Sequence, residues 1–81
     1  MNSKTLQIIP HGWPCKLIDC PPGLFSFTGD IGFKSEYCRD NAIAMEVFCA
    51  ESGEVFWGGS KTTHDRNELI VQPVIMQWVE M

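Results

Sequence analysis

Residues 44–59, AMEVFCAESGEVFWGG, decide the fold class, because they form the clearest structural unit in the chain. From Met45 to Ala50 every second residue belongs to the same set, so the pattern repeats every two residues. This period is typical of a β-strand whose two faces differ. Residues 55–57 form a second run rich in the branched and aromatic residues that strands prefer. Between the two runs Gly53 can adopt the left-handed conformation that ends a tight turn. The stretch therefore predicts a β-hairpin.

A second hairpin is predicted just upstream. Residues 24–28 (LFSFT) and 33–37 (FKSEY) both alternate, and the turn-forming residues 29–32 separate them. We expect one face of this hairpin to point inward and to consist of aromatic residues: Phe25, Phe27, Phe33 and Tyr37. Lys34 and Glu36 are expected on the wet face.

Single strands are expected at both ends of the chain. Residues 6–9 form an edge strand that ends at Pro10, and residues 15–19 form another short strand. Near the C-terminus residues 69–71 and 74–79 have extended character, with Pro73 breaking the strand or marking a sheet edge. One helical turn is predicted near residues 63–68, capped by Thr62 or Thr63.

These elements make one small domain over residues 1–81, with an N-terminal arm at 1–14 and a C-terminal strand or tail at 75–81. We expect an all-β, mostly antiparallel fold of five to six short strands with at most the one helical turn. An SH3-like barrel or a strongly curved sheet fits best, because closure removes exposed strand edges.

Composition disfavours several classes of protein. Ten acidic residues outnumber six basic ones, and the basic residues form no cluster. Nucleic-acid binding draws most of its affinity from Lys and Arg, so direct binding to DNA or RNA is disfavoured. No apolar run approaches the roughly 20 residues that cross a bilayer. The first ten residues, MNSKTLQIIP, also lack the apolar region of a signal peptide. We therefore expect a cytoplasmic protein without a membrane partner.

The four cysteines allow three interpretations: Cys15, Cys20, Cys38 and Cys49. They are reduced thiols, ligands of a structural zinc ion, or two disulfides. The second pair is too widely spaced for the usual zinc knuckle, and disulfides need an oxidising compartment. Reduced thiols, some of them small buried hydrophobes, are the favoured interpretation.

No group of residues identifies a catalytic chemistry. His11 and His64, the two histidines, both lie in predicted loops. A nucleophile needs a base beside it, and neither the serines nor the cysteines have such a neighbour in sequence. We expect no catalytic residue and no cofactor, so the protein is not expected to be an enzyme.

The aromatic residues point to a binding surface. Phe56 and Trp57 are consecutive in an extended segment and so must face opposite ways. Trp78 shares a face with Val74 and Met76 on the last predicted strand. Our hypothesis is that Trp57, Trp78 and Phe56 contribute to a protein–protein surface, where Trp is enriched. Packing within one chain and contact with a second copy in a homodimer are the alternatives.

Four segments carry a resemblance to a known group of proteins: KLIDCPPGLFSF, GFKSEY, ESGEVFWGGSKT and IVQPV. Together they resemble a family of small proteins encoded by tailed bacteriophages and prophages. The resemblance covers residues 16–74. It implies a viral origin and the cytoplasm of a bacterial host, and it carries over no activity and no site residues.

The sequence thus favours a non-enzymatic, phage-type accessory protein that binds a host or viral protein, a host-defence factor being one version. One alternative is a nucleic-acid-associated β-barrel in which Phe25, Phe27, Phe33 or Trp57 stacks on bases. The other is a module stabilised by zinc at the four cysteines.

Overall fold

One long strand, β6, organises the fold in the computed structural model, which describes residues 3–36 and 46–80. Strands β1, β2 and β3 all pair with β6, and all pairings are antiparallel. The elements in chain order are β1 (Lys4–Pro10), β2 (Cys15–Lys16), a 3₁₀ helix (Leu17–Asp19), β3 (Gly23–Phe27), β4 (Asp30–Lys34), β5 (Val47–Cys49), α1 (Thr63–Asn67) and β6 (Ile70–Glu80). The prediction of an all-β antiparallel fold with one short helical turn is confirmed.

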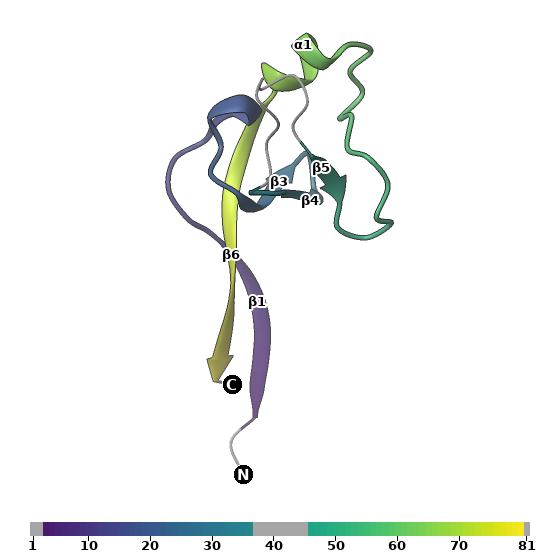
Figure 1. The fold of residues 1–81 in the computed structure, drawn as a ribbon. Helices are drawn as coiled ribbons and strands as arrows, with labels where there is room; N and C mark the ends of the chain where they lie inside the picture. The colour runs from purple at the N-terminus through teal and green to yellow at the C-terminus, as the bar shows by residue number, and fades with distance from the viewer. Residues whose placement is uncertain (1–2, 37–45, 81) are drawn as a thin grey trace.

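The sheet is open, so the barrel version of the prediction is wrong. Its strand order is β1-β6-β3-β4-β5, with β2 also on β6, and β1 and β5 lie at opposite ends of that order. β1 and the second half of β6 run side by side away from the other elements, and Lys4 pairs with Glu80 at the far tip (Figure 1). The molecule is therefore elongated, with extents of 49 × 25 × 23 Å.

We call the paired segments β1 and 74–80 of β6 the ribbon, and the remaining described residues the body. The segments predicted as an N-terminal arm and a C-terminal tail thus pair with each other. The ribbon exists because β6 does not stop at Pro73, where the sequence predicted a break or an edge. The missing N–H of Pro73 faces His11, one residue beyond β1, and its carbonyl accepts a hydrogen bond from the His11 N–H (2.9 Å). The proline therefore costs the ladder one bond, at its end.

The β3–β4 hairpin is confirmed, but its predicted faces are wrong after the turn. The turn is Thr28 and Gly29, both with positive φ, which is shorter than the predicted 29–32. In the observed register Phe25 pairs with Gly32, and Leu24 pairs with Phe33. Because paired residues share a face, Phe33 points outward and is 43% exposed.

Lys34, expected in water, is only 4% exposed. Its ammonium group donates hydrogen bonds to the carbonyl oxygens of Leu17 (2.9 Å), Ile18 (3.0 Å) and Cys20 (2.6 Å). These carbonyls lie in and just after the 3₁₀ helix, which replaces the second half of the strand predicted at 15–19. Lys34 thereby fastens this segment to the sheet.

The hairpin predicted at 44–59 is present in part. Strand β5 is followed by a turn in which Gly53 has φ +75° and donates to the Cys49 carbonyl (2.8 Å). Residues 55–57 form no strand, and Val55 makes a single bridge to Phe48. Ala44 and Met45 lie outside the described residues, as does Tyr37.

The core lies in the body, between β3, β5 and the start of β6. Its buried members are Leu17, Cys20, Phe25, Val47, Phe56 and Val71. Phe56 packs edge-on against Phe25 (5.0 Å between centroids) and Phe27 (5.8 Å). Helix α1 begins as predicted, since the Thr62 hydroxyl accepts a hydrogen bond from the Asp65 N–H (3.1 Å).

Candidate protein-binding surface

The ribbon exposes one strongly apolar face. Leu6 pairs with Trp78 and Ile8 pairs with Met76, and residues paired across antiparallel strands point to the same side. The exposed fractions are 46% for Leu6, 46% for Ile8, 56% for Met76 and 64% for Trp78. We call these four residues the apolar ribbon face.

The opposite face of the ribbon has a polar centre. Gln7 pairs with Gln77 in its middle, and both side chains are exposed. The same face also holds Ile9 and Ile75 toward the body, and Ile75 is 38% exposed, so this face is less apolar than the other but not wholly polar. Because the ribbon projects away from the body (Figure 1), the described part of the body does not form a second layer over its apolar side.

A groove of about 320 Å³ lies where the ribbon meets the body. Its lining is mostly apolar: His11, Pro21, Pro22, Gly23, Leu24, Pro73, Val74, Ile75 and Met76. Met76 belongs to both the groove and the apolar ribbon face, so the two features are continuous. A partner that covers the face can also place a side chain in this groove.

The structure separates the three predicted partner-binding residues. Trp78 lies on the apolar ribbon face. Trp57 lies on the body and is 42% exposed. Phe56 is 4% exposed and packs in the core, so its assignment to a binding surface is wrong. The two consecutive aromatic residues differ in burial as expected, but the inward one is Phe56.

Sequence reasoning missed Leu6 and Ile8 as members of the surface. Their alternation with Gln7 was the signal, but it identifies a face only once the partner strand is known. Because β1 pairs with the other end of the chain, nothing local to residues 6–9 indicated that Trp78 and Met76 would extend the same face.

Trp57 has a structural role that its exposure does not reveal. The Cζ atom of Arg66 lies 5.1 Å from the centre of the Trp57 ring, which is a cation–π distance. Arg66 is buried, its Nε has no hydrogen-bond partner among the described residues, and burial lowers the pKa of its guanidinium group. The ring therefore covers a buried charge.

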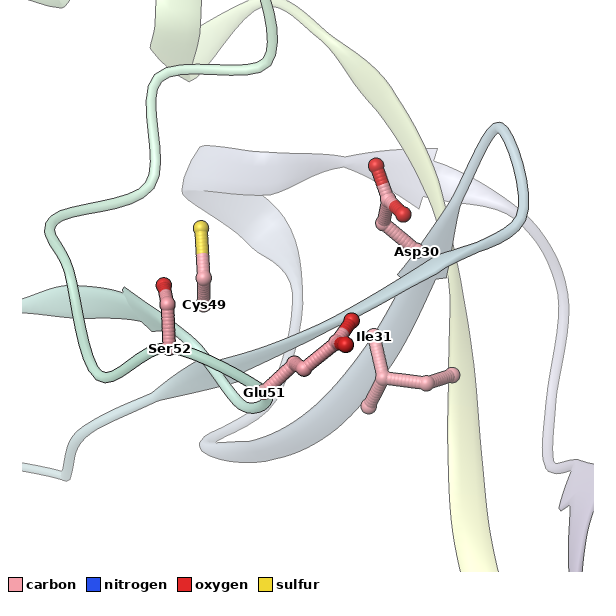
Figure 2. Close-up of a pocket in the computed structure, with 5 residues that line it drawn as sticks. All are labelled: Asp30, Ile31, Cys49, Glu51 and Ser52. Carbon is pink, nitrogen blue, oxygen red and sulfur yellow. The ribbon is translucent and has the colours of Figure 1, made fainter.

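A second hollow, of about 490 Å³, lies beside the β5 turn (Figure 2). It is lined by two carboxylates, a thiol, a hydroxyl and one apolar residue: Asp30, Glu51, Cys49, Ser52 and Ile31. Neither histidine lines it, so the thiol and the hydroxyl have no imidazole base beside them. The arrangement offers no nucleophile activated by a histidine.

The three cysteines that the structure describes differ in burial, and Cys20 is the buried one. Cys15, Cys20 and Cys49 are free thiols, and Cys38 lies outside the described residues. Burial, together with the nearby Cys15 thiol, raises the pKa of Cys20 to about 11, so this thiol keeps its proton at neutral pH. Within residues 3–36 and 46–80, no three His, Cys, Asp or Glu side chains are grouped to hold a metal ion.

The aromatic residues suggested for base stacking also differ in exposure. Phe25 is fully buried and Phe27 packs on Phe56, so Phe25 is not accessible to a base. Phe33 and Trp57 are partly exposed. Neither lies on the ribbon.

Comparison with protein-family models gives no match, and comparisons with curated proteins and with solved structures give none either. In the part of the chain that the structure describes, no helix is long and apolar enough to cross a membrane.

Proposed function

We propose that this protein is a non-enzymatic accessory protein of the phage type that binds another protein, of the host or of the virus, through the apolar ribbon face. One observation carries the proposal: Leu6, Ile8, Met76 and Trp78 stand side by side on a projecting ribbon, each about half exposed or more. The sequence resemblance to small phage proteins supports the origin, and with it a place in the cytoplasm of a bacterial host.

The size of the face is in the range that marks a binding site. The four exposed fractions correspond to roughly 400 Å² of apolar side chain, and exposed patches of this size on a monomer are often functional. Covering such an area removes on the order of 10 kcal/mol of unfavourable hydration before the costs of association are counted.

The residue types also suit a binding role. Trp is enriched among the residues that dominate binding energy, and Met adapts its shape to irregular surfaces. A two-stranded ribbon is only marginally stable by itself in water. A partner that covers the apolar ribbon face would therefore stabilise the ribbon as well as gain affinity from it.

Site-specific photo-crosslinking in the bacterial host tests this proposal. A photoreactive amino acid replaces Met76 in one variant and Gln77 in the matched control, whose side chain is exposed on the other side of the same strand. We expect one defined protein adduct from position 76 and none from position 77. We further expect that the substitution Trp78→Ser abolishes the adduct formed from position 76.

Equal adducts from both positions, or an adduct that survives Trp78→Ser, would contradict the proposal. Far-UV circular dichroism of each variant checks that the sheet is retained. Loss of the adduct then reports on contact rather than on folding.

A further inference from the structure

The outer edge of β1 presents unpaired backbone groups. β1 is the terminal strand of the sheet order, and among the described strands only β6 pairs with it. The direction of its backbone groups follows from the hydrogen bond between His11 N–H and Pro73 O (2.9 Å). In an antiparallel pair, residues that bond to the partner strand alternate with residues that point away from it. Gln7 therefore bonds toward β6, whereas Leu6 and Ile8 direct their N–H and C=O groups outward.

This edge is complementary to itself. When a second copy of β1 lies antiparallel alongside with all seven residues overlapping, the two-fold axis passes through Gln7. Leu6 of each copy then lies opposite Ile8 of the other, and both residues direct their hydrogen-bonding groups across the join. Gln7 lies opposite Gln7 of the second copy, in a pair without hydrogen bonds. The pattern closes on two copies, with one bond missing at each end because Pro10 faces outward and has no N–H, and the two bodies lie at opposite ends.

The outer edge of β6 is less suited to this pairing. β3 already occupies it at Gln72 and Pro73, and Pro21, Pro22 and Leu24 line the same groove as Val74 and Met76, so the body stands beside the start of the remaining run. Pairing β1 of one copy with β6 of another would place different edges together, which produces open chains rather than a closed dimer.

Edge pairing would also enlarge the proposed binding surface. Leu6 and Ile8 of each copy point to the same side as their new partners, so the two apolar ribbon faces become one. A single face of roughly 400 Å² is about half of the 800 Å² that each partner buries in a standard interface. The joined face, with eight large apolar side chains on four strands, reaches that area.

We propose that the ribbon binds a second copy of this chain, with the two chains paired through the outer edges of their β1 strands. The result is a four-stranded ribbon whose continuous apolar face is the binding surface. This inference rests on the proposed function for the role of the face, but the pairing itself is a separate claim about the edge.

Charge substitution at the two-fold axis tests the pairing. Gln7→Lys places two like charges directly opposite each other and leaves the apolar ribbon face unchanged. Gln77→Lys is the matched control, because it adds the same charge on the same side, but its copies lie three strand spacings, or about 14 Å, apart. By sedimentation equilibrium we expect Gln7→Lys to weaken the dimer about fivefold or more and Gln77→Lys to change it little. Mixing Gln7→Lys with Gln7→Glu should restore the dimer.

Amide hydrogen exchange provides the second measurement. In the dimer the Leu6 and Ile8 amides should exchange slowly, and Gln7→Lys should accelerate them, while the amide of residue 7 itself, bonded toward β6, stays slow. A monomeric wild-type chain, a dimer equally insensitive to both lysine substitutions, or a dimer with fast Leu6 and Ile8 exchange would overturn the pairing.

The two proposals can fail separately. If the dimer behaves as expected but the adduct from position 76 survives Trp78→Ser, the proposed function fails and the pairing stands. If the adduct behaves as expected but the wild-type chain is a monomer, the pairing fails and the proposed function stands.

Discussion

The ring of Phe25 lies directly over Gly32, the residue paired with it across the β3–β4 hairpin, so that a Cβ atom at Gly32 would overlap the ring. Phe25 is fully buried and contacts Phe56 edge-on. The absence of a side chain at residue 32 is therefore part of the core packing. It allows a large ring to fill the space above one strand.

We expect Gly32→Ala to lower the free energy of unfolding by about 1–3 kcal/mol, because the added methyl group overfills the core. Urea denaturation measures the change. Gly29→Ala is a useful comparison, since that residue has φ +89° and open space around its Cβ position, so it reports backbone strain without a clash. The double substitution Phe25→Leu with Gly32→Ala should cost less than the sum of the single changes. If the two changes in unfolding free energy were strictly additive, the Phe25 ring would not be the group that the added methyl group overlaps.

Lys34→Met should destabilise the protein by roughly 3 kcal/mol, because hydrogen bonds from charged groups each contribute more than neutral ones. The substitution removes the common donor to the Leu17, Ile18 and Cys20 carbonyls while preserving the apolar stem. Lys16→Met, which removes an exposed ion pair with Glu68 (2.8 Å), should have a much smaller effect. Similar denaturation midpoints for the two variants would count against the anchoring role of Lys34.

The stability of the protein should fall as pH rises from about 9 to about 11, in part through Cys20. The folded state raises the pKa of this thiol from 9.0 to about 11. Between these values the unfolded chain loses the thiol proton and the folded chain keeps it, so stability present below pH 9 is lost as the pH rises through 11. The contribution is on the order of 2 kcal/mol. In Cys20→Ala the decline should be shallower over this pH interval, and parallel curves for the two proteins would refute the assignment.

Phe56→Ala should cost about 3–5 kcal/mol, whereas Trp78→Ser should leave the stability of the body nearly unchanged. Phe56 fills the core between Phe25 and Phe27, and Trp78 is 64% exposed on the ribbon. Thermal unfolding followed by circular dichroism compares the two variants. If Trp78→Ser destabilised the protein more than Phe56→Ala, the core position of Phe56 would be contradicted and its predicted surface position supported.

The sequence predicted the local elements better than the pairings: the β3–β4 hairpin is as expected, whereas β5 pairs with β4 and makes only one bridge to residue 55. Strands β3, β4 and β5, the turn at Gly53 and the cap at Thr62 all follow from residues within a few positions of one another. The error at Phe33 and Lys34 arose because alternation separates the two faces of a strand without saying which one is buried. The aromatic ring was expected inside and the ammonium group outside. The opposite holds because three carbonyls distant in sequence receive the Lys34 ammonium group.

The ribbon was less accessible to prediction, because it too depends on segments far apart in the chain. Pro73 is a local signal for a break in the strand. The sheet tolerates this proline because its missing N–H falls at the very end of the β1–β6 ladder, a position that exists only when β1 lies alongside. Trp78 could be identified as a candidate surface residue from alternation alone. Leu6 and Ile8 could not be identified as its neighbours, because the sequence of neither strand determines the register between two strands that are distant in the chain.

The pairing of β1 with β6 has a consequence for folding on the ribosome. Lys4 pairs with Glu80 and Pro10 with Val74, so the longest ladder of the sheet joins the earliest and the latest of the described strands to be synthesised. Such distant contacts form slowly, because a long loop must close before they stabilise anything. The β3–β4 hairpin of the body can form earlier, while β1 remains unpaired with Leu6 and Ile8 uncovered. During that interval the nascent chain would be most prone to association with chaperones or with other nascent copies of itself.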